Sequence, residues 1–144
     1  MEEKTVIDKT VIDKKKEYLN SYNNLYIKLN SLEEQLESLR ETKEAARAQV
    51  LSDMPKGSKH TDLSDYIVKL DDMITKISKL KQECTNKKLD IEKNIAEMSD
   101  GTQSNIIFKR YIEFKTWDQI CTEIGYSWRQ THRLHCKALV NFKL

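Results

Sequence analysis

Residues 115–142 read KTWDQICTEIGYSWRQTHRLHCKALVNF, and this stretch decides the expected fold of the C-terminal third of the chain. Its apolar residues recur at helical spacing over 117–124 and again over 128–142. The apolar positions are Trp117, Ile120, Cys121 and Ile124 in the first segment and Thr131, Leu134, Ala138, Leu139 and Phe142 in the second. The spacing therefore predicts two amphipathic helices that pack through these faces.

Both helices carry start signals in their side chains. Each follows a capping box, in which a hydroxyl side chain caps the helix and a Gln three residues later reaches back. The pairs are Thr116 with Gln119 and Ser127 with Gln130, and Gly125 supplies the left-handed residue that ends the first helix. A further helical pattern over 104–114 precedes them. Residues 101–144 are therefore expected to form a trihelical helix-turn-helix domain.

The first 100 residues carry the heptad spacing of a coiled coil. Apolar side chains alternate gaps of four and three along one seam from Tyr18 to Val50 and a second from Leu63 to Met98. Pro55 and Gly57 interrupt the pattern between them, and Thr61 or Asp62 can cap the second helix. We therefore expect a long antiparallel coiled-coil hairpin, with arms at about 10–50 and 62–98 and a loop at 51–61. The predicted fold class is all-α.

Three details qualify this hairpin. The sequence TVIDK occurs twice, at 5–9 and 10–14, and its five-residue period fits no helical seam, so a frayed start is expected. Lys81 and Lys88 interrupt the second seam, which is costly unless their stems reach water or a carboxylate meets them. A second apolar stripe lies off the seams, at Leu19, Tyr26, Met73, Leu80 and Leu89. A homodimer formed through the hairpin would cover this stripe.

Composition and charge narrow the class of protein. Residues 101–144 hold seven Lys or Arg against three Asp or Glu, whereas residues 1–100 hold 18 against 20. The basic C-terminal end suits a polyanion such as nucleic acid. Three cysteines without CxxC spacing favour neither a disulfide framework nor a zinc ribbon. With no signal-like or membrane-spanning run of apolar residues, we expect a cytoplasmic protein without a membrane partner.

The second helix of the C-terminal domain is the candidate DNA-recognition element. Its outward side is basic, and residues 127–144 contain no acid. Arg can fork onto guanine in the major groove, and Lys and further Arg can neutralise phosphates. The expected DNA-binding residues are Ser127, Trp128, Arg129, Gln130, His132, Arg133 and Lys137. Trp128 could pack on a thymine methyl or sugar, or lie against the preceding helix.

Residues 116–142 resemble the fourth conserved region of bacterial sigma factors, through the Trp117/Ile120/Ile124 face, the Gly125-Tyr126-Ser127 turn and the Lys137-Ala138-Leu139 run. The resemblance implies that Trp128, Arg129, His132, Arg133 and Lys137 face DNA. Trp128 and Thr131 depart from the sigma pattern, which has Arg and a branched aliphatic there. With the hairpin and the loop sequence SDMPKG (52–57), the chain is similar to small phage and prophage proteins of unassigned function from low-GC Gram-positive hosts. That family is similar to phage late-gene activators and autolysin regulators.

These features predict a sequence-specific transcription regulator of phage or prophage genes that binds double-stranded DNA, and not an enzyme. His132 and Cys136 could supply two ligands on one helix face, but no third and fourth ligand is placed, so neither a metal nor another cofactor is expected. Two alternatives stay open. One is a small terminase-like DNA-packaging subunit, although such subunits usually place the DNA-binding unit first. The other is an interaction protein that binds RNA polymerase.

Overall fold

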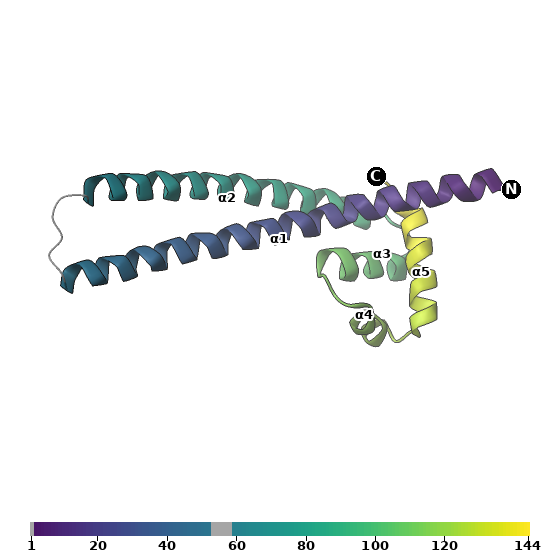
Figure 1. Ribbon diagram of the computed structural model, residues 1–144. Helices are drawn as coiled ribbons and strands as arrows, with labels where there is room; N and C mark the ends of the chain where they lie inside the picture. The colour runs from purple at the N-terminus through teal and green to yellow at the C-terminus, as the bar shows by residue number, and fades with distance from the viewer. Residues whose placement is uncertain (1, 53–58) are drawn as a thin grey trace. The chain divides into compact units, whose positions relative to one another are not determined.

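The computed structural model describes the backbone of residues 2–52 and 59–144 and the side chains of residues 9–48 and 63–144. These residues are all-helical, as predicted. The helices are α1 (Glu2–Ser52), α2 (Lys59–Ala96), α3 (Gly101–Ile107), the π-helical turn η1 (Phe108–Ile112), α4 (Trp117–Ile124) and α5 (Trp128–Asn141), in the order shown in Figure 1. None of the described helices is both long and apolar enough to cross a membrane.

Three helices begin at other residues than predicted. α1 is helical from Glu2, where a frayed start was expected, and α2 begins at Lys59, before the caps expected at Thr61 or Asp62. α3 begins at Gly101 and not near residue 104, because the carboxylate of Asp100 accepts a hydrogen bond from the backbone N–H of Gln103 at 2.9 Å and caps the helix. The turn signals Pro55 and Gly57 lie outside the described residues.

Contacts divide the chain into two compact units, Met1–Leu25 with Cys84–Leu144, and Tyr26–Glu83. The expected boundary at residues 100 and 101 does not follow this division. The first unit instead contains a segment of each long helix, because Leu19 of α1 and Ile91 of α2 are fully buried in it. Leu19 was expected on an uncovered stripe, and its burial corrects that expectation.

The unit Tyr26–Glu83 pairs early residues of α1 with late residues of α2, in antiparallel order. Lys81 meets Glu33 at 3.3 Å, and the ammonium of Lys43 lies 4.2 Å from the ring centre of Tyr66. Both members of the first pair are largely exposed, so it contributes little stability. A carboxylate thus meets the ammonium of Lys81, as expected for a Lys at a seam position. In the other unit the ammonium of Lys88 lies 3.8 Å from the carboxylate of Glu92.

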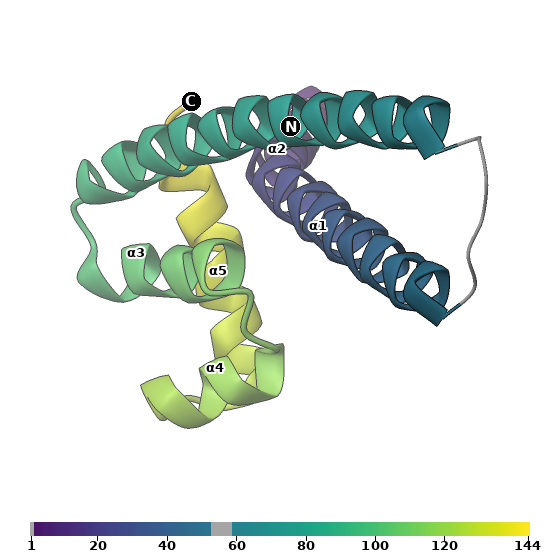
Figure 2. The same ribbon diagram turned by 90° about the vertical axis from the view of Figure 1, so that its left-hand side faces the viewer.

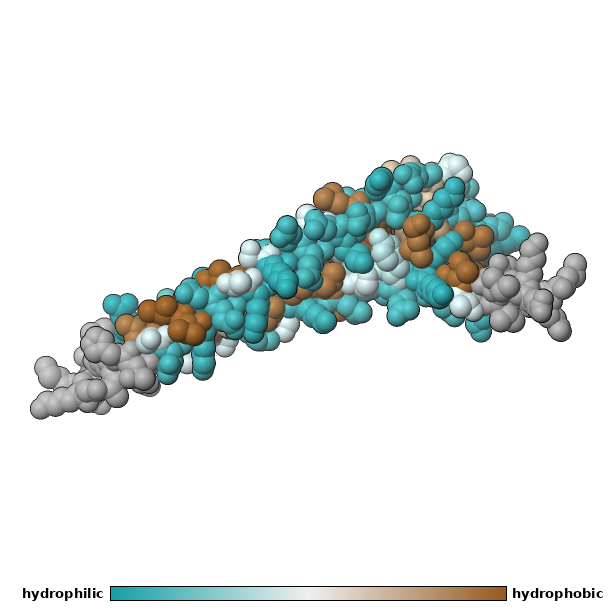
Figure 3. All heavy atoms as spheres, turned by 90° about the horizontal axis from the view of Figure 1, so that it is seen from above, coloured by the Kyte–Doolittle hydropathy of each residue, from teal (hydrophilic) through white to brown (hydrophobic). Residues whose placement is uncertain are grey.

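Apolar burial in this unit is incomplete. Leu29 and Ile77 are buried, but several seam positions of α2 keep more than two fifths of their surface exposed. The exposed apolar residues of this unit are Tyr26, Ile27, Leu63, Ile67, Val68 and Ile74. Hydrophobic surface is visible on the arm in Figure 3, beside the grey residues on the left. Such surface is a candidate for contact with another molecule.

The other unit has a continuous core around α3 and α5, which lie against each other in Figures 1 and 2. Its buried apolar side chains come from every helix of the unit: Leu19, Tyr22, Cys84, Ile91, Ile95, Ile106, Ile107, Tyr111, Ile112, Ile120, Ala138, Leu139 and Phe142. Burial of this many large side chains is the main stabilising term for the unit. One side of α5 is therefore packed against this core along the helix.

Between α3 and α4 the chain makes a π turn where a regular helix to residue 114 was expected. The N–H of Glu113 donates to the carbonyl of Phe108 at 3.1 Å, and that of Lys115 donates to the carbonyl of Lys109 at 3.0 Å. Phe114 has a positive φ of 57°, and its ring stacks on Tyr22 of α1 at 5.4 Å. The turn thus ends this helix early, and the stacked ring compensates the backbone strain at Phe114.

Candidate nucleic-acid interface

Two helix caps set the position of α4. The Thr116 hydroxyl accepts from the N–H of Gln119 at 3.3 Å, and the Gln119 side chain accepts from the N–H of Thr116 at 3.0 Å. Both arms of the predicted capping box are therefore present. At the other end Gly125 has a φ of 74°, the left-handed conformation that glycine adopts without strain. The sequence predicted both ends of this helix.

The start of α5 is fixed by Ser127, whose hydroxyl accepts from the N–H of Gln130 at 3.2 Å. This is one arm of the predicted capping box, and the side chain of Gln130 is exposed. The Thr131 hydroxyl donates to the Ser127 carbonyl at 2.8 Å and accepts from the Cys121 thiol at 3.3 Å. Thr131 is fully buried, so its hydroxyl joins α4 to α5 where a sigma-like domain would have an aliphatic contact.

α5 has one buried and one exposed side. Thr131, His135, Ala138 and Leu139 are buried, in agreement with the predicted apolar face. Arg129, Arg133 and Lys137 recur every four residues along the other side and are exposed. Within the described part of the chain these three side chains form no ion pair and no hydrogen bond. A row of uncompensated cations therefore runs along the outer side of α5.

Glu113 and Glu123 are paired with cations outside α5. Glu123 contacts Lys109 and Lys115 at 2.7 Å each, and Glu113 contacts Lys115 at 3.1 Å. The hydrogen bonds from Lys109 and Lys115 lower the pKa of Glu123, and the bonds to Glu123 and Glu113 raise the pKa of Lys115. Two of the three acids of residues 101–144 are thereby paired with cations outside α5. The cations of α5 stay available for an external anion.

Aromatic rings connect the start of α5 to α4. The ring centre of His132 lies 3.8 Å from that of Trp128 and 4.4 Å from that of Trp117. His132 is half-buried, and its Nε2 atom is buried without a hydrogen-bond partner. Burial, with the charges of Arg110 and Lys16, lowers the pKa of His132. His132 was expected to face DNA, whereas here it packs between two indoles because both rings lie within stacking distance.

His135 continues the same row of rings into the core. Its ring centre lies 4.6 Å from that of Trp117, and a hydrogen bond of 2.8 Å joins its Nε2 to the Tyr111 hydroxyl. Burial, aided by Lys16, His132 and Arg110, lowers the pKa of His135 to about 4. Burial also raises the pKa of Tyr111 to about 12. The pair is therefore neutral near pH 7. His135 lies on the buried side of α5, and no sequence signal identified Tyr111 as its partner.

The C-terminal end of α5 is held by a residue that the sequence did not single out. The Lys15 ammonium donates to the carbonyls of Leu139 and Val140 at 2.9 and 3.0 Å. These carbonyls lack helical partners because α5 ends at Asn141, and a cation suits this end of the helix dipole. Lys15 is buried, which lowers its pKa. An N-terminal segment of α1 thus caps the candidate recognition helix.

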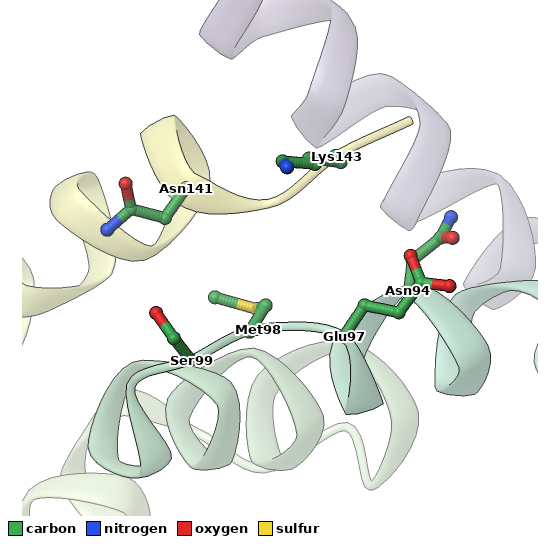
Figure 4. A pocket seen from close by; sticks show the side chains of 6 residues that line it. All are labelled: Asn94, Glu97, Met98, Ser99, Asn141 and Lys143. Carbon is green, nitrogen blue, oxygen red and sulfur yellow. The ribbon is translucent and has the colours of Figure 1, made fainter.

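The metal ligands considered from the sequence, His132 and Cys136, can be located among the described residues. No group of three or more His, Cys, Asp or Glu side chains gathers there in metal-binding geometry. Cys136 is exposed while His132 is half-buried between rings. A hollow of about 310 Å³ lies between the end of α2 and the end of α5, as Figure 4 shows. Its lining residues are Asn94, Glu97, Met98, Ser99, Asn141 and Lys143. This lining lacks a nucleophile paired with a base.

Comparison with known proteins gives one family. Residues 46–142 match the family model described as "Protein of unknown function (DUF1492)", which agrees with the expected membership of a family without an assigned function. No curated protein and no solved structure matches the chain.

Proposed function

The chain belongs to the DUF1492 family, whose function is unknown, and we propose from its own residues that it is a sequence-specific DNA-binding transcription regulator. In this proposal α4, the Gly125 turn and α5 form a helix-turn-helix, and α5 enters the major groove of double-stranded DNA. The resemblance of the sequence to small phage and prophage proteins supports the further proposal that its target genes belong to such elements in a low-GC Gram-positive host.

One observation carries the proposal, the unpaired cationic side of α5. Arg129, Arg133 and Lys137 are exposed and unpaired among the described residues, and no acid follows residue 126. Glu113 and Glu123, two of the three acids of residues 101–144, are paired with Lys109 and Lys115 and not with the cations of α5. Phosphates of DNA would supply the missing counter-charges, and guanine edges would supply acceptors for the guanidinium donors.

The residues of the outer side take different roles in this mechanism. Arg129 and Arg133 lie one turn apart, and a guanidinium can fork onto guanine O6 and N7 and thereby read sequence. Lys137 lies one turn further along and neutralises a phosphate as a point charge. Ser127 and Gln130 lie at the helix start, where the backbone approaches the groove. His132 acts indirectly, through the rings that it supports.

The arms supply the second part of the proposal. We propose that α1 and α2 form an antiparallel coiled-coil hairpin and that two chains associate through its exposed apolar residues. Leu63, Ile67 and Ile74 belong to the predicted seam yet stay exposed in one chain, which supports an external partner for them. A dimer would present two recognition helices to successive major grooves. Sedimentation that shows a monomer at high concentration would contradict this part.

The experiment is a footprint and gel-shift titration of the full chain on DNA from its own genomic neighbourhood. The wild-type protein should protect a defined site, and Arg133→Ala should weaken binding to that site by roughly 1 to 3 kcal/mol. Lys137→Ala should weaken binding on specific and random DNA alike and reduce the salt dependence by about one counterion. Arg40→Ala is the matched control, because it removes an exposed Arg of α1 from the other unit.

The remaining outcomes distinguish the alternatives. Salt-sensitive binding to every sequence would favour a terminase-like packaging subunit, whose contacts are to the phosphate backbone. Absence of DNA binding together with capture of purified RNA polymerase would favour the interaction protein. Equal loss for Arg133→Ala on specific and random DNA would reassign Arg133 from a base to a phosphate.

A further inference from the structure

Trp128 combines two properties that rarely occur together in one side chain. It is the first residue of α5 and is 60% exposed, although large aromatic side chains are usually well buried. Its ring is nevertheless held in place, since its centre lies 3.8 Å from that of His132 at an interplanar angle of 48°. The sequence left open whether Trp128 packs inward or faces DNA. In the structure the ring packs on His132 of the same helix, and three fifths of the surface of Trp128 stays exposed to solvent.

The support beneath Trp128 is itself well anchored. The ring of His132 also packs against Trp117 at an interplanar angle of 45°, and the guanidinium of Arg110 lies 4.7 Å from the ring centre of Trp117. Arg110 is fixed in turn by a 3.0 Å hydrogen bond to the Lys115 carbonyl. A side chain positioned by such a stack loses little rotational entropy when it binds a partner.

The position of Trp128 on α5 limits what it can touch in a DNA complex. The N-terminal residues of a recognition helix contact base edges, and the thymine methyl is the one apolar group that the major groove offers. An indole presents a large apolar surface with one N–H donor and no acceptor. We propose that Trp128 packs on the 5-methyl group of a thymine in the target site and that His132 is its positioning residue. This inference rests on the proposed DNA binding.

The test is a methyl-deletion scan of the site defined by the footprint. Each thymine is replaced in turn by deoxyuridine, which removes only the methyl group, and affinity is measured by fluorescence anisotropy at fixed salt. At one thymine in each half-site, the wild-type protein should lose about fourfold in affinity, the value of one buried methyl group. Trp128→Ala should bind the thymine and deoxyuridine versions of that position equally.

Variants of neighbouring residues separate contact from support. Arg129→Ala should weaken binding to the defined site whether thymine or deoxyuridine stands at that position, and should therefore keep the fourfold preference for thymine. His132→Ala should lose the preference because Trp128 loses its support, and His132→Phe should restore it because a ring again stacks there. A merely structural role for His132 would change the unfolding free energy without changing the thymine preference.

The outcomes keep this inference apart from the proposed function. If the wild-type protein binds no DNA, both fail. If the wild-type protein protects a defined site but every deoxyuridine replacement leaves its affinity unchanged, the proposed DNA recognition stands. The methyl contact is then overturned by the wild-type measurements alone. A preference that persists in Trp128→Ala would assign the methyl contact to another residue and overturn the role of Trp128.

Discussion

Protonation of His135 is expected to destabilise the unit that contains α5. His135 is only 5% exposed, and its pKa in the folded chain is about 4, against 6.5 for the ordinary side chain. Each pKa unit corresponds to about 1.4 kcal/mol. The free energy of unfolding is therefore about 3 kcal/mol higher when the His135 ring is neutral than when it is protonated.

The sign follows from which state binds the proton first. As the pH falls through 6.5, the unfolded chain takes up a proton at this position while the folded chain does not, so the unfolding free energy decreases. The loss is complete near pH 4. The charged groups that face His135 come from α1, η1 and α5, namely Lys16, Arg110 and His132, and all oppose a further positive charge. His132, with a lowered pKa of its own, adds a smaller loss of the same sign.

The assay is urea unfolding followed by circular dichroism between pH 7.5 and 4.5. Wild-type protein should lose about 2 to 3 kcal/mol over this range because of His135 alone. His135→Gln should be less stable at pH 7.5 but should show a correspondingly flatter dependence on pH. His132→Gln, which removes the other titrating ring, is the control and should keep most of the wild-type slope. Equal slopes for wild type and His135→Gln between pH 6.5 and 4.5 would refute the reasoning.

Two further substitutions test how α1 supports α5. Lys15→Met should lower the unfolding free energy by about 1 to 3 kcal/mol, because the Leu139 and Val140 carbonyls lose their donor, whereas the exposed neighbour Lys14→Met should have no effect. Leu19→Ala should cost about 2 to 5 kcal/mol, because Leu19 is fully buried, while Leu89→Ala, on an exposed position of α2, should cost less than 1 kcal/mol. Urea unfolding measures the free energy of unfolding of all four variants. Equal losses for Lys15→Met and Lys14→Met, or for Leu19→Ala and Leu89→Ala, would contradict the role given to Lys15 or to Leu19.

Local features of the C-terminal region could be predicted from the sequence because their partners lie within one helical turn. The Thr116 box, the left-handed Gly125 and the Ser127 cap each depend on residues three or four positions apart, and all are present. The buried side of α5 follows from helical periodicity in the same way. The same periodicity puts Arg129, Arg133 and Lys137 on the opposite, exposed side of the helix.

Contacts between distant parts of the chain could not be predicted. Lys15 and Leu139 are 124 residues apart, and nothing in the sequence around Lys15 distinguishes it from its exposed neighbour Lys14. His132 was assigned to the DNA-facing side by its helical position and by the sigma-factor resemblance. The neighbouring indoles of Trp117 and Trp128 draw it inward, and this depends on how α4 packs against α5. The π turn at η1 likewise depends on tertiary contacts such as the stacking of Phe114 on Tyr22.

These distant contacts bear on how a helix of this length could read DNA. α5 has 14 residues, and recognition requires its exposed side chains to be held within about 0.5 Å of their working positions. Its start is fixed by the Ser127 cap and the stacked rings, and its end is fixed by Lys15 and by Tyr18, whose ring centre lies 6.5 Å from that of Phe142. Lys15 and Tyr18 both belong to α1. The unit that would bind DNA is therefore discontinuous in sequence, and anything that shifts the first turns of α1 also shifts the recognition helix.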